Sequence, residues 1–240
     1  MSGENALAVR GLQMRYGALR VLEGLDFDAR AGRITALIGP NGAGKSTAFA
    51  CIAGATRATA GSVRLFGREL AGVPAYAVAR LGLVRTYQIV QTFADMTVLE
   101  AVTVGALLRH PRLDVARDAA LRVLERVGLA RRADVLGKAL TIADKKRLEL
   151  ARALAAEPRV LLLDEVLAGL TPAEGRAAVE LVRGIANDGI SIVMVEHVME
   201  TLIPLADHVI VLSAGRCIFD GLAAAALADP AVIEAYLGRP

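Results

Sequence analysis

Hydrophobic and polar residues alternate over the first part of the chain. Leu25, Phe27 and Ala29 occupy one side of an extended segment, and the charged residues between them occupy the other. A period of two is the pattern of a strand with one buried face. We therefore expect antiparallel strands over residues 6–29.

The next part of the chain contains short apolar runs separated by helical sequence. The first run, Ile34–Ile38, leads through a Gly-rich turn into a helix expected over 45–53, which Gly54 would end. Later runs occupy residues 160–163, 190–195 and 209–212. Strands joined by helical crossovers form a parallel sheet, so the sequence predicts an α/β fold.

Between residues 75 and 132 the strand signals fade and helical spacing replaces them. Over 116–127, the side chains of Leu121, Leu124 and Val127 are expected on one apolar helix face. This pattern predicts a helical lobe, after which the α/β core resumes.

Composition limits the class of protein. The 240 residues are 55% hydrophobic but only 4% aromatic, so Ala, Val and Leu must fill the core. Charged or turn residues break every apolar run before the roughly eighteen residues that a membrane-spanning helix needs. The net charge of +3 comes without a dense basic run, which favours phosphate groups over nucleic acid as partners.

The N-terminus and the cysteines indicate the compartment. Residues 1–10 lack the pattern of a secretory signal, and Cys51 and Cys217 lack metal-ligand spacing. We expect a cytoplasmic location and two reduced thiols, to which no function is assigned.

One segment fits the phosphate-loop pattern G-x-x-x-x-G-K-[ST] between an expected strand and an expected helix. It consists of Gly39, Pro40, Asn41, Gly42, Ala43, Gly44, Lys45 and Ser46. Gly42 and Gly44 allow backbone angles that a Cβ would obstruct, so N–H groups can converge on phosphate oxygens. Lys45 would neutralise the outer phosphates, Ser46 would coordinate Mg²⁺ and Thr47 would donate to an inner phosphate. The segment predicts binding of ATP and Mg²⁺; an ordinary Gly-rich turn is the alternative.

An apolar strand ends in two carboxylates, Asp164 and Glu165. Because ligands of open α/β sheets bind at the carboxyl ends of the strands, Asp164 should lie beside the loop and reach Mg²⁺ through water. Glu165 is expected to act as the general base on the water that attacks the γ-phosphate. A pair of solvated acids at a strand end is the alternative for this motif taken alone.

Together with these motifs, five further segments give the chain a resemblance to a known family. The segments are 84–88, 96–100, 147–154, 168–172 and 230–238. Over essentially its whole length the sequence resembles the ABC transporter ATPases, and most closely the importer subunits that serve branched-chain amino acids and related small solutes.

The resemblance implies a P-loop (RecA-like) nucleotide-binding core with an N-terminal antiparallel β subdomain and an inserted helical subdomain. It implies one domain over 1–240, in which 1–85 hold the first part of the core with the β subdomain. Residues 86–150 would form the helical subdomain with the signature region, and 151–240 the rest of the core and the tail.

The resemblance also implies roles for three isolated residues. Tyr16 looks like the aromatic residue that stacks on adenine, and a surface or packing tyrosine is the alternative. Gln88 looks like the glutamine that reaches Mg²⁺ and the attacking water while its loop touches the membrane subunit. His197 resembles the switch histidine that senses the γ-phosphate, and a structural histidine is the alternative.

The signature segment departs from the family pattern. Where the family has Leu-Ser-Gly-Gly-Gln, residues 140–144 read Leu-Thr-Ile-Ala-Asp. Thr141 keeps the hydroxyl that would face the ATP of the opposite subunit, and Ala143 keeps an N–H but adds a methyl group. Asp144 adds negative charge near an anion, unless it forms a capping box with Thr141, which we expect. Our hypothesis is a working signature with altered affinity.

From this resemblance we expect an ATPase that drives import of branched-chain amino acids or a related small polar solute. The partners implied are a second ATPase subunit in a head-to-tail dimer, two membrane-spanning permeases and, indirectly, a solute-binding protein, with no nucleic acid. The location implied is peripheral, on the cytoplasmic face of the membrane. The alternatives are a soluble non-transport ABC ATPase and a nucleotide-binding regulator with weak turnover.

Overall fold

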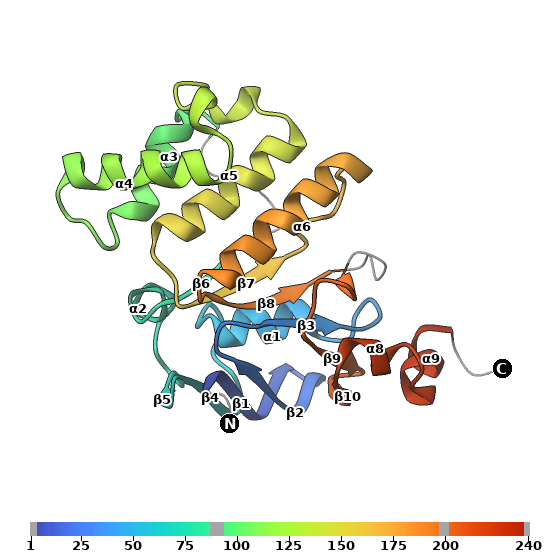
Figure 1. Cartoon of the computed structure of the whole chain (residues 1–240). Coiled ribbons are helices and arrows are strands. Elements are labelled where there is room, and N and C mark those ends of the chain that lie inside the picture. Colours follow the sequence, from blue (N-terminus) through green and yellow to red (C-terminus); the bar gives the residue numbers. More distant parts are fainter. Residues whose placement is uncertain (1–3, 87–93, 197–201, 238–240) are drawn as a thin grey trace.

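The computed structural model describes residues 4–86, 94–196 and 202–237 of the chain (Figure 1). Gln88 and His197 lie outside these ranges, so the expectations for them stay predictions. No helix within the described ranges combines the length and apolar content that crossing a membrane would require.

The N-terminal part forms a four-stranded antiparallel sheet in the order β2-β1-β4-β5. Its strands are β1 (Asn5–Tyr16), β2 (Leu19–Arg30), β4 (Ala60–Leu65) and β5 (Arg68–Glu69). The predicted alternation is confirmed, because Leu25, Phe27 and Ala29 are buried on one side of β2. An antiparallel sheet commonly has one polar face exposed to water and one apolar face packed on the core.

The second sheet has six strands in the order β10-β9-β3-β8-β7-β6, all parallel except for the antiparallel edge strand β10. Its strands are β3 (Ile34–Ile38), β6 (Leu83–Arg85), β7 (Val160–Asp164), β8 (Ser191–Val195), β9 (His208–Ser213) and β10 (Arg216–Gly221). The α/β fold expected from the apolar runs is confirmed. Strand β6 was not expected, since three residues are too few to show a period.

Helices fill the connections between the strands. They are α1 (Lys45–Ile52), α2 (Ala75–Arg80), α3 (Val98–Ala106), α4 (Leu113–Arg126), α5 (Ile142–Ala155), α6 (Pro172–Asn187), α8 (Ala223–Ala226) and α9 (Pro230–Leu237). Two 3₁₀ turns, η1 (Ala130–Arg132) and η2 (Gly137–Ala139), lie between α4 and α5. Helix α1 ends one residue before the expected Ala53, and Gly54 follows with φ +69°, as expected of a helix-ending glycine.

The parallel sheet has an apolar core on each face. One core joins the sheet to α3, α4, α5 and α6, and the other joins it to α1 and the antiparallel sheet. Figure 1 shows these layers, with α5 and α6 above the parallel sheet and the antiparallel sheet below α1. Alternate residues of β7 face opposite cores, which is why its sequence is apolar throughout.

The helical lobe expected between the strands is present, but one of its predicted core residues is not buried. Leu124 and Val127 are buried, whereas Leu121 is 37% exposed. The buried stripe of α4 runs instead through alanines such as Ala116 and Ala120. Small side chains let α4 approach α3 closely, and they place Leu121 at the margin of the stripe.

Candidate active site

The predicted phosphate loop connects β3 to α1, and three of its glycines have positive φ. The angles are +150° at Gly39, +79° at Gly42 and +106° at Gly44. A Cβ at Gly39 would lie 2.0 Å from the Leu212 carbonyl oxygen, and one at Gly44 would lie 2.8 Å from that of Val21. The loop therefore needs glycine at its first position for space as well as for backbone angle.

Helix α1 starts from this loop without a side-chain cap. Its N-cap is Gly44, whereas α3 and α6 have threonine caps. The first N–H groups of a helix have no partner within the helix, so those of Lys45, Ser46 and Thr47 are available to an anion. A hollow of about 230 Å³ lies in front of them. It is lined by Val21, Asn41, Gly42, Ala43, Gly44, Lys45, Ser46, Thr47 and Glu165.

Lys45 is held against the loop. Only 6% of the residue is exposed, and its Nζ donates to the carbonyl oxygens of Gly39 at 2.7 Å and Pro40 at 2.9 Å. An ammonium group has three donors, which leaves one for a ligand in the hollow. Burial lowers the pKa of Lys45, and the negative charges of Glu165 and Asp164 act against this effect.

The C-terminal strands support the loop from behind. The turn between β9 and β10 donates from the Gly215 N–H to the Ala43 carbonyl at 3.0 Å and accepts from the Glu23 N–H at 2.9 Å. From α9, the phenol of Tyr236 forms a hydrogen bond with the Gly39 backbone, while burial raises its pKa. These supports join residues that are distant in sequence, and no local pattern predicted them.

Asp164 ends β7 in an almost fully buried position. Arg85, at the end of β6, donates from Nη2 to Asp164 Oδ2 at 2.6 Å. The Asp164 N–H donates to the Thr86 hydroxyl at 3.1 Å, and the guanidinium of Arg85 lies 5.7 Å from the ring centre of Phe49 in α1. Arg85 belongs to segment 84–88, one of those that resemble the family, and the sequence analysis predicted no role for it.

Glu165 lines the hollow together with Lys45 and Ser46, as the predicted base should. Its φ is +50°, which non-glycine residues rarely adopt. Its N–H donates to the Val195 carbonyl at 2.9 Å, and its own carbonyl accepts from Lys146 Nζ. Lys146 was also not predicted to belong to this site.

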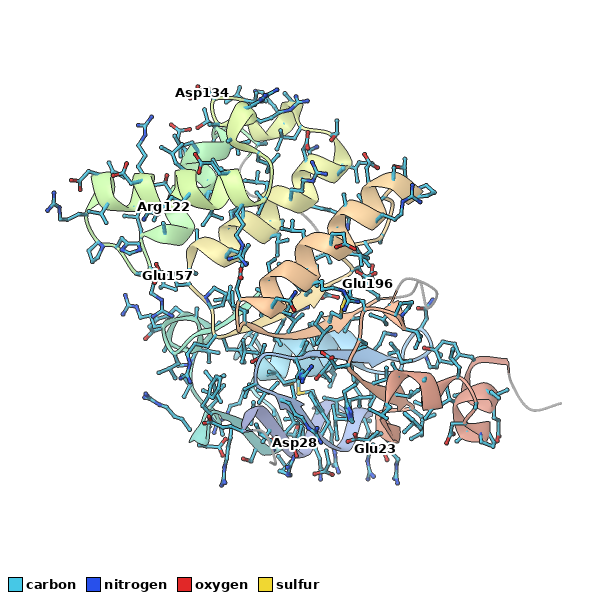
Figure 2. All side chains as sticks on the ribbon, viewed as in Figure 1. Glu23, Asp28, Arg122, Asp134, Glu157 and Glu196 are labelled. Carbon is cyan, nitrogen blue, oxygen red and sulfur yellow. The ribbon has the colours of Figure 1, made fainter. Side chains whose placement is uncertain are left out.

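Glu196 is a second carboxylate near Glu165 that the sequence analysis missed. The residue is 2% exposed, and its Oε1 accepts from the Leu167 N–H at 2.8 Å. Burial raises its pKa to about 7. It follows β8 directly, and Figure 2 labels its position. A charged residue directly after an apolar strand was the available signal.

The signature segment forms the start of α5, and half of the expected capping box is present. The Thr141 hydroxyl accepts from the Asp144 N–H at 3.1 Å. The expectation that the Asp144 carboxylate folds back on the helix end is wrong: its oxygens lie 3.6 Å from Arg132 Nε and 3.7 Å from Arg147 Nη1. In α3 and α6 glutamates complete the box, and aspartate is one methylene shorter.

Other predicted residues lie away from the hollow. Tyr16 is 51% exposed at the end of β1, where a stacking partner can reach it. Ala143 is buried in a groove with Val166 and Leu170, so its methyl group packs between helices. Neither Tyr16 nor Thr141 belongs to the residues that line the hollow within the described part of the chain.

The residues at the loop fit a magnesium ion bound with a nucleotide. Within the described ranges, no group of three or more His, Cys, Asp or Glu side chains is arranged to hold a metal. Mg²⁺ in nucleotide sites takes few protein ligands, because water and phosphate oxygens complete its shell. The exposed Ser46 and the carboxylate of Asp164 supply donors of the required kind.

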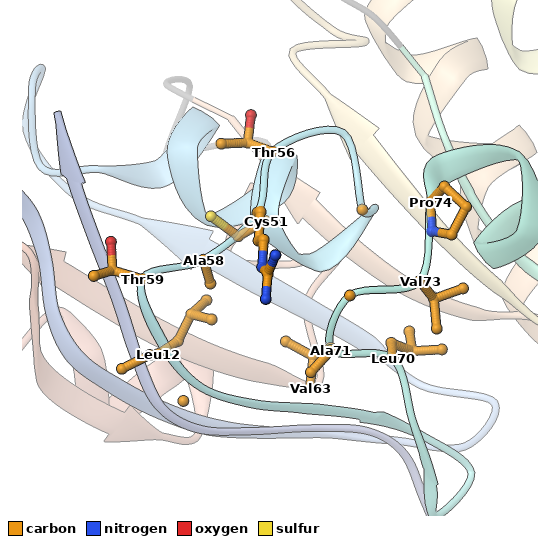
Figure 3. Close-up of a pocket in the computed structure, with 15 residues that line it drawn as sticks. Leu12, Cys51, Thr56, Ala58, Thr59, Val63, Leu70, Ala71, Val73 and Pro74 are labelled. Atoms are coloured by element: carbon orange, nitrogen blue, oxygen red, sulfur yellow. The ribbon is translucent and has the colours of Figure 1, made fainter.

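A larger hollow, of about 440 Å³, lies between the end of α1 and the antiparallel sheet (Figure 3). Its labelled lining residues include Leu12, Cys51 and Val73. The lining includes no carboxylate, and burial raises the pKa of Cys51 to about 11. A thiol with such a pKa is a poor nucleophile, so this hollow supplies no chemistry to the loop.

Family models match most of the sequence. The model described as "ABC transporter" matches residues 22–168, and the model described as "Branched-chain amino acid ATP-binding cassette transporter" matches residues 216–240.

Curated relatives agree in length with the chain. The "High-affinity branched-chain amino acid transport ATP-binding protein LivG" of Salmonella typhimurium is 37% identical over 97% of this chain and 98% of its own. The corresponding BraF protein of Pseudomonas aeruginosa is 34% identical, with the same coverage of both chains.

Solved structures share the fold. A nucleotide-free ATP-binding cassette from an ABC transporter superposes with a TM-score of 0.90 at 26% identity, over 98% of this chain and 100% of the other. A cassette in its ADP conformation gives 0.89 at 26% identity, over 98% and 99% of the two chains.

Proposed function

The chain belongs to the ABC transporter family of ATP-binding cassettes, and on this basis we propose that it hydrolyses ATP to drive import of branched-chain amino acids or a related small polar solute. The names of its relatives and the family model at its C-terminus support this solute class. The observation that supports the chemistry best is the hollow that Lys45, the start of α1 and Glu165 line together.

The reaction is transfer of the γ-phosphoryl group from ATP to water. The loop N–H groups and the Lys45 ammonium hold the phosphates and balance the charge that develops on them. Ser46 and Asp164 are the proposed holders of Mg²⁺, which would neutralise charge on the phosphate oxygens. Glu165 orients the attacking water and accepts its proton.

The remaining roles are proposals from the family resemblance. Tyr16 stacks on adenine, Gln88 links the metal and the attacking water to the membrane subunit, and His197 contacts the γ-phosphate. Thr141 and the N–H of Ala143 face the ATP of a second subunit across a head-to-tail dimer. The exposed side chain of Ile142, 64% accessible beside Thr141, is available for such an interface.

The proposed assembly contains two ATPase subunits, identical or paralogous, and two membrane-spanning permeases on whose cytoplasmic side the ATPases lie. A solute-binding protein would act indirectly, by delivering cargo to the permeases. We also propose the division of the single domain into 1–85 with the β subdomain, 86–150 with the helical subdomain and 151–240 with the rest of the core and the tail.

The test measures nucleotide affinity and turnover separately in the complex with its membrane subunits. Lys45→Ala should abolish ATP binding at micromolar concentrations, and Glu165→Gln should keep binding but lose turnover by at least about 100-fold. Lys145→Ala is the matched control, because Lys145 does not belong to the residues that line the hollow. Full turnover in Glu165→Gln, or unchanged ATP affinity in Lys45→Ala, would overturn the proposal.

One observation favours a second candidate, a nucleotide-binding regulator with weak turnover. The signature segment lacks both glycines of the family pattern, and Asp144 carries a negative charge near the helix end. ATP affinity with turnover that the membrane subunits do not stimulate would identify this regulator.

A further inference from the structure

Glu165 has a backbone conformation that its surroundings must hold. Its φ of +50° lies in the left-handed region, which a residue with a Cβ occupies at a cost. Such residues persist at functional sites where neighbouring groups fix them. The groups that fix Glu165 therefore bear on its chemistry.

Three contacts fix the backbone around Glu165, and they come from two elements. From the end of β8, the Val195 carbonyl accepts from the Glu165 N–H at 2.9 Å, and Glu196 Oε1 accepts from the Leu167 N–H at 2.8 Å. From α5, Lys146 Nζ donates to the Glu165 carbonyl. The peptide groups on both sides of Glu165 are thus attached to other parts of the molecule.

Lys146 and Glu196 are charged residues in an environment that disfavours charge. Glu196 is 2% exposed, and Lys146 is half-buried on the inner side of α5. Burial lowers the pKa of Lys146, and the negative charges of Glu196, Glu165 and Asp164 act against this effect. Burial of such groups is disfavoured unless they are paired and hydrogen-bonded, and an apolar pair would fill the same space at lower cost.

We propose that Lys146 and Glu196 are positioning residues that hold Glu165 in the conformation in which it activates water. This inference rests on the proposed function, in which Glu165 is the general base. Neither residue lines the hollow; Lys146 acts through the Glu165 carbonyl, and Glu196 acts through the Leu167 N–H two residues later.

Lys146 also gives this arrangement a link to the signature segment. It lies one helical turn after Ile142, the first residue of α5, and Thr141 caps the same helix end. Ile142 and Lys146 belong to one continuous helix, so a shift of its N-terminus would move the Lys146 ammonium and with it the Glu165 carbonyl. Contact of a second subunit with Thr141 would in this way adjust the base of the first subunit.

The test compares Lys146→Met and Glu196→Leu with matched controls in the complex with its membrane subunits. Both variants should lower kcat about 10-fold to 100-fold, because small misplacements of a catalytic group cost that much, and should leave ATP affinity within about twofold. Lys145→Met, a neighbour 100° around the helix, should keep wild-type kcat. Lys146→Arg and Glu196→Gln keep a donor and an acceptor and should retain most of the turnover.

The outcomes separate this inference from the proposed function. If Glu165→Gln is inactive while Lys146→Met and Glu196→Leu turn over at the wild-type rate, the positioning role is wrong. The proposed role of Glu165 as general base then still holds. An equal decrease of kcat in Lys146→Met and Lys145→Met would also overturn the positioning role, since it would indicate a general effect of charge. If Glu165→Gln is fully active, the proposed function itself fails.

Discussion

Arg85 donates to Asp164 at 2.6 Å, and the two side chains are only 11% and 4% exposed. The pair joins the ends of the neighbouring strands β6 and β7. A second ion pair, Arg33 with Asp207, spans 3.3 Å between side chains that are 63% and 43% exposed. The chain thus contains a buried pair and an exposed pair of the same chemistry.

Arg85→Met should destabilise the protein by about 3–5 kcal/mol, because it leaves the Asp164 carboxylate buried without its partner. Arg33→Met should cost less than about 1 kcal/mol, since water screens the exposed pair. Chemical denaturation of both variants measures the difference. A similar decrease of the unfolding free energy in the two variants would show that burial does not determine the contribution of these ion pairs.

Gly39→Ala should abolish nucleotide binding, because its Cβ would lie 2.0 Å from the Leu212 carbonyl oxygen and the strand end would have to move. Gly42→Ala meets nothing within 4 Å and is disfavoured by its φ of +79° alone, at a cost of about 1–2 kcal/mol. Titration with a fluorescent ATP analogue should rank the wild type above Gly42→Ala and Gly42→Ala above Gly39→Ala. The reverse order for the two variants would show that the loop does not rest on β9.

Thr141→Ala should weaken ATP-dependent dimerisation about fivefold, since it removes the hydroxyl proposed to face the ATP of the second subunit, a loss of about 1 kcal/mol. Asp144→Gln should change it less, because the carboxylate points to Arg132 and Arg147. Sedimentation of Glu165→Gln carrying each change measures dimerisation with ATP. A larger effect of Asp144→Gln would mean that the carboxylate faces the nucleotide after all.

Glu196 should make stability fall as the pH rises. Its folded pKa of about 7 exceeds the ordinary 4.5, so the folded state binds the proton more tightly. The contribution of Glu196 to the free energy of unfolding is therefore fully present below pH 4.5 and is lost as the pH rises through 7. The loss amounts to about 3 kcal/mol.

Glu196→Gln keeps the acceptor for the Leu167 N–H and cannot ionise. Its unfolding free energy should therefore lack this pH dependence between 4.5 and 7 and should exceed that of the wild type above pH 7. Denaturation at several pH values measures this free energy. If it changes with pH in the same way for both proteins across this range, the prediction is wrong.

The sequence predicts what depends on local pattern. The strands β3 and β7, the glycines of the loop and the placement of Glu165 all follow from short segments with a known period or spacing. The resemblance to a family supplied the order of the motifs and the inserted helices.

The parts that were missed depend on contacts distant in sequence. Arg85 and Asp164 are 79 residues apart, and Lys146 reaches Glu165 from another helix. Periodicity does not show which strand ends lie next to each other. The sequence pattern therefore could not distinguish these side chains from exposed charged residues. The failed half of the capping box is a matter of one methylene, because spacing alone does not distinguish Asp144 from the glutamates of α3 and α6.

The supports of the phosphate loop by Gly215, Leu212 and Tyr236 have a consequence for how the protein is made. Every residue that lines the hollow has been synthesised once Glu165 is added, yet the strand that bears on Gly39 is added later. A chain that stops after β8 holds every residue that lines the hollow, but on a loop without these supports. We therefore expect the loop to reach its nucleotide-binding form only when the last stretch of the chain has been added.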